Sequence, residues 1–248
     1  ANGYLENGWV AAKCRHLKPE MYIERLGLPP EWDGQEITDG TLFVFQEQGI
    51  GDELRFANCF EDLSEKSKTK CFVETDARLI PLFSRSFPKL NFIEKLEREV
   101  DNHVIVNYAE AVEKLNSTVH CPLGDLPLHF RPSINHFNFN DAYLVPDENE
   151  RAYWREVFEK IGQELKIGFC WQTALPSKTY DSYFPDLHEL GPIFALKNAT
   201  FVNLQYTDCE QQLQAAENDF NIPIFRPTNI DMFNELDRVA ALISECDI

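Results

Sequence analysis

Basic residues are scarce in this chain. Its 248 residues include 23 lysines and arginines against 41 aspartates and glutamates, which gives a formal net charge of −18 at pH 7. Nucleic acids and anionic membrane surfaces are bound through basic patches, so this balance argues against both as partners. A small ligand that carries phosphate is still compatible with the composition, because one or two local cations are enough to hold it.

Paired cysteines and long apolar runs are also missing. The seven cysteines are scattered and never form C-x-x-C, so neither a zinc site nor a disulfide framework is predicted. We expect reduced, mostly buried thiols. No apolar run approaches the length that spans a bilayer, and no signal peptide is recognisable. A cytoplasmic location is the expectation, and the chain, which begins with alanine, is expected to be cut from a longer protein.

Strand-like and helix-like segments alternate along the chain. Hydrophobic residues make up 44% of it, which is typical of a folded globular protein. The alternation predicts βαβ units and parallel sheets, an α/β fold. The expected strands cover residues 41–45, 70–74, 91–94, 103–106, 165–171, 200–206 and 222–225, with another beginning at 245. The expected helices cover residues 4–17, 77–86, 147–163, 185–196, 209–218 and 232–244. Residues 120–130, which contain two prolines, are expected to form a loop.

One stretch, TLFVFQEQGIGDELRFANC from Thr41 to Cys59, carries the strongest functional signal. An apolar strand is followed by a glycine loop and then by a helical spacing that opens at Asp52. Glycines allow a ligand to approach the backbone closely. Asp52 either caps the helix or accepts a proton from a bound substrate, and spacing alone favours the cap. His120 is a candidate site histidine, the alternative being a ring that bonds only to the backbone.

Six motifs, taken together in their order along the chain, resemble a known family. They are W-D-G-Q from Trp32, the Thr41–Phe56 stretch, H-C-P-L-G-D-L-P-L-H-F from His120, A-Y-L from Ala142, I-G-F-C-W from Ile167 and F-V-N-L-Q-Y from Phe201. Together they resemble the glycosyltransferase region that follows tetratricopeptide repeats in many bacterial proteins. That region is similar in turn to the heptosyltransferases. The match covers nearly the whole chain.

The resemblance implies a GT-B fold with two Rossmann-like domains, the second incomplete here. It divides the chain into residues 1–35, the end of a helical repeat and a linker; 36–147, the acceptor-side domain; and 148–248, an interdomain helix and part of the nucleotide-sugar domain. Such enzymes transfer sugar with inversion and without a metal or other cofactor, which agrees with the absence of a D-x-D pair. The protein or glycan acceptor and the nucleotide-sugar are the implied partners.

The resemblance also assigns residues. Asp52 corresponds to the general base, which overturns the preference for a cap. Gln48, Gly49, Gly51 and His120 are expected to contact the acceptor. The residues expected to contact the donor are Thr173, Lys178, Gln205 and Tyr206. Two of these have structural alternatives, because Lys178 can be a solvated loop lysine and Gln205 an edge residue.

Two departures from the family pattern favour a second hypothesis for this piece, whereas the intact G-I-G-D favours an enzyme for the longer protein. An arginine expected near residue 181 is missing, and the Gly-rich turn expected after residue 248 is not present. The alternative function is therefore a module that binds carbohydrate or protein without chemistry, and we expect the chain alone to be inactive. An oxidoreductase fits less well, because the loop lacks the third glycine of G-x-G-x-x-G. The sequence leaves the sugar, the nucleotide, the acceptor and the oligomeric state open.

Overall fold

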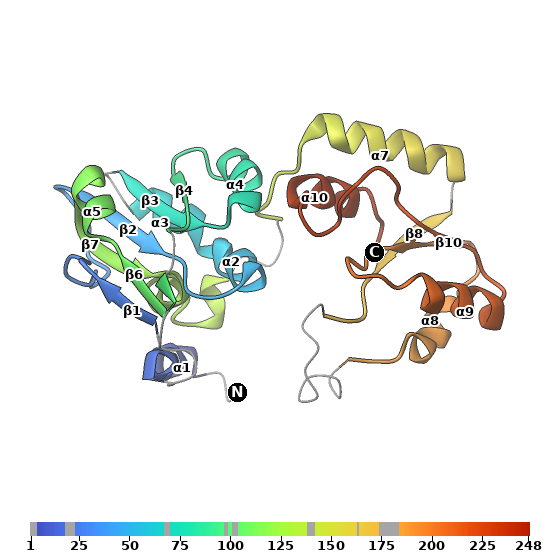
Figure 1. Ribbon diagram of the computed structural model, residues 1–248, viewed down its shortest axis with the longest axis horizontal. Coiled ribbons are helices and arrows are strands. Elements are labelled where there is room, and N and C mark those ends of the chain that lie inside the picture. Colours follow the sequence, from blue (N-terminus) through green and yellow to red (C-terminus); the bar gives the residue numbers. More distant parts are fainter. Residues whose placement is uncertain are drawn as a thin grey trace. The chain divides into compact units, whose positions relative to one another are not determined.

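The computed structural model describes residues 4–17, 23–66, 70–96, 99–100, 104–137, 142–162, 164–173 and 184–248 (Figure 1). The chain divides into two compact units, Ala1–Val145 and Pro146–Ile248. Each unit contains a parallel sheet, as α/β domains do.

The first unit alternates strands and helices. Its strands are β1 (Ile23–Leu26), β2 (Thr41–Phe45), β3 (Cys71–Thr75), β4 (Asn91–Glu94), β5 (Glu99–Val100), β6 (Val104–Asn107) and β7 (Ser117–Pro122). Its α-helices are α1 (Leu5–Ala12), α2 (Ile50–Phe56), α3 (Phe60–Lys66), α4 (Ile80–Ser86), α5 (Ala109–Leu115) and α6 (Leu126–Phe130). Its 3-10 helices are η1 (Lys13–Leu17), η3 (Ala57–Cys59), η4 (Ala77–Leu79), η5 (Leu123–Asp125) and η6 (Ile134–His136).

The main sheet of this unit has the order β4-β3-β2-β7, and all its strands are parallel. Every residue of β2 is buried, which is why its sequence is an unbroken run rather than an alternation of apolar and polar residues. The expected strands at 41–45, 70–74 and 91–94 are therefore confirmed. Their carboxyl ends share one edge of the sheet, where ligands of parallel sheets bind.

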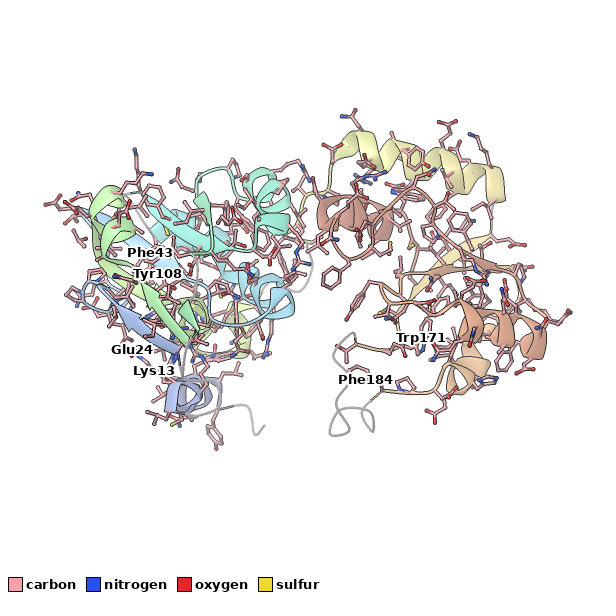
Figure 2. The ribbon with its side chains drawn as sticks, in the orientation of Figure 1. Lys13, Glu24, Phe43, Tyr108, Trp171 and Phe184 are labelled. Atoms are coloured by element: carbon pink, nitrogen blue, oxygen red, sulfur yellow. The ribbon has the colours of Figure 1, made fainter. Side chains whose placement is uncertain are left out.

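The expected strand at 103–106 exists as β6, but it does not join the main sheet. It pairs in parallel with β1 and antiparallel with β5 in a separate sheet of order β1-β6-β5. Val106 and Tyr108 pack against Phe43 and Phe45 of β2, and the ring centres of Phe43 and Tyr108 are 5.3 Å apart. Figure 2 labels Phe43 and Tyr108. The second sheet thus covers a face of the first instead of extending its edge.

The loop expected at residues 120–130 is wrong. This stretch continues β7, which lies beside β2, and then forms η5 and α6. Its prolines are compatible with regular structure because Pro122 is the last residue of the strand and Pro127 lies in the first turn of α6. Neither position needs a backbone N–H for a hydrogen bond within its own element.

The expected amphipathic helix at 4–17 is shorter than predicted and buries no residue. It ends at Ala12 and continues as η1, with Tyr4 and Leu17 exposed. Trp9 does reach the rest of the unit, because its indole N–H donates to the carbonyl of Arg131 at 2.7 Å.

The second unit also has a parallel sheet, of order β10-β9-β8. Its strands are β8 (Leu165–Phe169), β9 (Ala199–Asn203) and β10 (Ile224–Phe225). Its helices are α7 (Glu148–Ile161), η8 (Leu187–Leu190), α8 (Gly191–Phe194), α9 (Glu210–Phe220) and α10 (Leu236–Ser244). The expected elements up to residue 244 are confirmed here, although α10 begins four residues later than predicted.

Helices cover both faces of this sheet. Phe201 and Val202 are neighbours in β9 and point to opposite faces. Phe201 packs in a cluster with Phe194 and Leu213 of α8 and α9, and Val202 packs in a cluster with Trp154 of α7. The helices α7 and α10 lie side by side (Figure 1), and Arg151 of α7 pairs with Glu245 at 2.8 Å.

The last residues run along the free side of β8. The N–H of Ile248 donates to the carbonyl of Lys166 at 3.3 Å, and the N–H of Gly168 donates to the carbonyl of Ile248 at 2.9 Å. These two bonds have the pattern of a parallel ladder, but residues 245–248 form no strand, so the strand predicted to begin at 245 is not present. Separately, no helix within the described ranges has the length and apolar character needed to cross a bilayer.

Candidate functional site

The loop after β2 is open above its two glycines. Gly49 and Gly51 are exposed, and a Cβ atom added to either would meet no atom within 4 Å. Gly49 has a φ of −85°, so its backbone does not require glycine either. Packing and backbone conformation thus leave these glycines unexplained, whereas close approach of a ligand to the loop would explain them.

Asp52 is the third residue of α2 and does not cap it. The N-cap position belongs to Gly49, no side chain makes a cap hydrogen bond there, and the N–H of Asp52 donates to the carbonyl of Gly49 at 3.0 Å. The cap favoured by spacing alone is therefore wrong, because the helix begins two residues before the aspartate. The carboxylate of Asp52 is half-buried and has no hydrogen-bond or ion-pair partner within the part of the chain that the structure describes.

A buried carboxylate next to Asp52 fixes the start of α2. Glu53 is 1% exposed and accepts hydrogen bonds from the Thr75 hydroxyl and from the N–H of Asp76 at the end of β3. Burial raises the pKa of Glu53. A second buried carboxylate, Glu74, accepts from the N–H of Gln46 at 2.9 Å. The loop that carries Asp52 is thereby tied at both ends to β3.

Asp76 extends this cluster and supports a prediction about stability. Its carboxylate accepts from Arg78 Nε at 2.8 Å and from Lys95 Nζ at 3.1 Å, and it caps η4. Arg78, and then Lys95, hold the pKa of Asp76 well below its usual range. A carboxyl with a lowered folded pKa stabilises the fold above its unfolded pKa, near 4, and loses that contribution as the pH falls.

We expect Asp76→Asn to lower the free energy of unfolding by about 1–2 kcal/mol at pH 7. The difference from wild type should narrow as the pH falls below about 4, because the carboxyl of the unfolded wild type then becomes protonated while the native carboxyl still carries its charge. Urea unfolding followed by circular dichroism between pH 7 and pH 2.5 measures it. Glu156→Gln removes an exposed ion pair with Lys160 and serves as the control, with no measurable change expected. A difference that stays constant with pH would contradict this assignment.

Glu47 joins the loop to two other parts of the unit. It makes a bidentate pair with Arg15 of η1, at 3.1 and 2.8 Å, and accepts from the N–H of Gly124 at 2.8 Å. Arg15 also lies 2.7 Å from Asp125, which is 3% exposed. A Cβ on Gly124 would lie 3.0 Å from the ends of the Arg15 and Glu47 side chains, so that pair would have to shift to admit a larger residue. The segment before β1 is thus fixed onto the carboxyl ends of β2 and β7.

His120 lies on β7, beside β2. Its backbone bonds to residues 30 and 32, its Nδ1 lies 2.6 Å from the carbonyl of Pro29, and its ring lies 5.6 Å from that of Phe45. The ring also lines a cavity of 230 Å³. The His120 ring therefore has the backbone contact expected of a purely structural histidine, and it also faces a cavity that a ligand could enter.

The W-D-G-Q motif forms a turn that packs on the same strand. The indole N–H of Trp32 donates to the carbonyl of Gln35 at 2.8 Å, and the backbone N–H of Trp32 donates to the carbonyl of His120 at 2.7 Å. Gly34 has a φ of +85°, and a Cβ there would lie 2.4 Å from the His129 ring. This motif is structural.

In the second unit, Gln205 connects the carboxyl ends of β8 and β9. Its side chain is 3% exposed. The amide oxygen accepts from the N–H groups of Trp171 and Gln172, at 3.3 and 3.2 Å. The amide nitrogen donates to the carbonyl of Gln172 at 3.0 Å and to the Thr207 hydroxyl at 2.9 Å. Its polar atoms therefore hold the start of the loop that follows β8.

The other predicted donor residues are distributed around this loop. Thr173 and Tyr206 are half-buried, and the Tyr206 ring lies 6.2 Å from that of Phe233. Gln172 lines a cavity of 350 Å³ together with Asp208 and residues at the start of α9. Lys178 lies outside the described residues.

The structure therefore brings Gln48, Gly49, Gly51 and Asp52 together at the end of β2, with His120 on the neighbouring strand. It brings Thr173, Gln205 and Tyr206 to the corresponding edge of the second sheet. Sequence reasoning missed the partners that hold the first group in place. Glu47 and Asp125 stand inside the motifs quoted above, which was the available signal, whereas Arg15 had none.

Comparison with known proteins adds two likenesses, and no protein-family model matches the chain. In sequence it is 30% identical over 259 residues to protein FlbA of Caulobacter vibrioides, an alignment that covers 100% of this chain and 42% of FlbA. The chain thus spans less than half the length of that relative. In structure it is similar to the glycosyl transferase family 9 protein of Veillonella parvula, with a TM-score of 0.53 and 11% identity over 89% of this chain and 76% of the other. This likeness confirms the predicted fold class, an α/β chain of the GT-B type.

Proposed function

We propose that this chain belongs to a glycosyltransferase that moves a sugar from a nucleotide-sugar to a protein or glycan acceptor, with inversion and without a metal or other cofactor. The observation that carries the proposal is the loop at the end of β2. There Asp52 is half-buried, makes no cap, and follows two glycines that no contact within the unit explains. The fold shared with a family 9 transferase supports the same class of reaction.

The proposed step is a proton transfer coupled to displacement. An acceptor hydroxyl attacks the anomeric carbon of the donor, and the bond from that carbon to the diphosphate oxygen breaks with its electron pair leaving on the diphosphate. The Asp52 carboxylate accepts the proton of the attacking hydroxyl. Gln48, Gly49 and Gly51 would contact the acceptor through the open loop, and His120 through the cavity that it lines.

On the donor side we assign Lys178 to the diphosphate, whose leaving charge requires cations or N–H donors. Thr173 and Tyr206 are assigned to direct contact with the donor. For Gln205 we propose a role through the loop, because its amide is already bonded to Trp171, Gln172 and Thr207. A link to upstream tetratricopeptide repeats and a cytoplasmic location complete the proposal.

Calorimetric titration with UDP, GDP and ADP tests the donor half of this function. We expect one of them to bind saturably, and Lys178→Ala to weaken that binding about tenfold, as loss of one charge-assisted contact to phosphate should. Lys160→Ala, on the exposed side of α7, is the matched control and should change nothing. Failure of all three nucleotides to bind would contradict a donor site in this chain.

A further inference from the structure

A cavity of 230 Å³ opens at the carboxyl ends of β2 and β7. Its walls come from η1, β1, β2 and β7. The lining includes His16, Ile23, Arg25, Phe45, His120 and Asp125. In Figure 2 the neighbouring Lys13 and Glu24 mark this end of the unit. The cavity is therefore built jointly by the segment before β1 and by the sheet that carries Asp52.

Three residues that line this cavity have a buried polar atom without a hydrogen bond to any described residue. Five buried side-chain polar atoms lack a hydrogen-bond partner within the described ranges, and three of them belong to its lining: His16 Nε2, Arg25 Nε and Asp125 Oδ2. Buried polar atoms are nearly always satisfied by protein, water or ligand. Three such atoms around one space indicate that something with hydrogen-bonding groups fills it.

Two of these residues, Asp125 and Arg25, are held in place by contacts with their neighbours. Asp125 is 3% exposed; its Oδ1 pairs with Arg15 at 2.7 Å, and its Oδ2 makes a longer ion pair with Lys13 Nζ at 3.5 Å. The guanidinium of Arg25 lies over the Phe45 ring, 4.5 Å from its centre, and Nη1 donates to the carbonyl of Ile23 at 3.3 Å. These contacts hold the carboxylate and the guanidinium in place.

His16 adds a group that can donate or accept. Its Nε2 lies 3.3 Å from Glu47 Oε1 but forms no hydrogen bond. Burial lowers the pKa of His16, which favours its neutral imidazole. A neutral imidazole suits a hydroxyl partner, which can play either role.

The mixed charge of the walls selects the class of ligand. Lys13 and Arg25 disfavour a cation, and Glu31 and Asp125 disfavour an isolated anion. A neutral, hydroxylated ligand satisfies an acceptor such as Asp125 Oδ2 and a donor such as Arg25 Nε at once. The volume is below the roughly 300–1,000 Å³ of pockets for drug-sized ligands, and equals about eight water volumes, which is suitable for one sugar ring.

We propose that this cavity binds one neutral monosaccharide unit of the acceptor, through Arg25, Asp125 and His16. The inference rests on the proposed transferase function and deepens it, because it makes the acceptor a glycan instead of a bare polypeptide. Glu47 lies two residues before Gly49 in the catalytic loop and pairs with Arg15. This pair connects the loop to the segment that forms one wall of the cavity. The segment before β1 thus supplies part of the acceptor site.

The test is an NMR titration of the full chain, labelled at histidine, with methyl β-D-glucoside, methyl α-D-mannoside and methyl N-acetylglucosaminide. We expect at least one of them to shift the His16 ring signals saturably in the millimolar range. Arg25→Lys keeps the charge but removes Nε, and should weaken binding about tenfold. Ile23→Phe fills the cavity without changing any charge and should abolish binding. Arg85→Lys removes an Nε donor that bonds to Val145 elsewhere in the unit, and should leave binding unchanged.

Two results would overturn the proposal. In one, none of the glycosides shifts His16. In the other, glycerol or acetate shifts it with the same affinity, which would show that the cavity holds only water or small solutes. The nucleotide titration described above tests the transferase function separately. Glycoside binding without nucleotide binding would keep this site and remove the function, whereas nucleotide binding with an unresponsive His16 would do the reverse.

Discussion

In the longer protein from which this chain is expected to be cut, replacing Asp52 with asparagine should lower sugar transfer by about 10²- to 10⁴-fold, the range that a general base contributes. Asparagine has the same shape but cannot accept the proton of the attacking hydroxyl. The fold should not change, because the Asp52 carboxylate has no hydrogen-bond or ion-pair partner among the residues described and does not cap α2. Melting temperature and nucleotide affinity should therefore match wild type.

The measurement is release of nucleoside diphosphate in the presence of acceptor, at donor concentrations that separate kcat from KM. The loss should appear in kcat, since a base acts on the reacting bond and not on donor binding. Asp39→Asn, at an exposed turn on the other side of β2, is the matched control. If the longer wild-type protein binds nucleotide and glycoside but releases no diphosphate, it is a binding module with a transferase fold, and the catalytic assignment of Asp52 is wrong.

Periodic elements were predictable from sequence because their signals are local. The apolar run of β2 indicated a strand buried on both faces, and Asp76 and Asp147 cap the elements that they were predicted to begin or precede. The pairing of strands, in contrast, depends on residues that are far apart in the sequence. Nothing in residues 23–26 shows that they form β1 beside β6, because the partner lies about 80 residues later in the chain.

The prolines of residues 120–130 misled the prediction for a related reason. A proline breaks regular structure only where its missing N–H is needed. Pro122 ends β7 and Pro127 begins α6, so neither N–H is needed there. Whether a proline stands at such a boundary depends on what the strand pairs with, which the local pattern does not contain.

The candidate site divides in the same way. Glycines and an aspartate at the end of a buried strand could be read as a loop, and that loop exists. The groups that position it could not be read, because Arg15 and Glu47 are 32 residues apart and Glu53 and Asp76 are 23 apart. The neighbouring acids Asp52 and Glu53 look equivalent in sequence. Only the fold shows that one is half-buried and unpaired while the other is buried and bonded to the end of β3.

Replacing Trp154 with alanine is expected to destabilise the second unit by about 3–5 kcal/mol. Trp154 is 1% exposed and packs with Phe158, Val202 and Leu242 in the hydrophobic cluster between the sheet and the helices α7 and α10. Removing the indole leaves a cavity between rigid elements that the ion pairs of Arg151 and Glu245 keep in place, so the site cannot collapse fully. Trp154→Phe should cost much less, because it keeps the aromatic packing and removes an indole N–H that has no partner among the described residues.

Native-state hydrogen exchange measures this effect for each unit separately. The amides of β8 and β9 should exchange about 10²- to 4 × 10³-fold faster in Trp154→Ala, which is the expected free energy converted at 1.4 kcal/mol per factor of ten. The amides of β2 and β3 should be unchanged, because each unit has its own core. Tyr153→Ala, at the adjacent position with 40% exposure, is the matched control and should change exchange less than tenfold. Equal acceleration in both sheets would show that the two units unfold as one, and would place the stabilising role of Trp154 beyond the second unit.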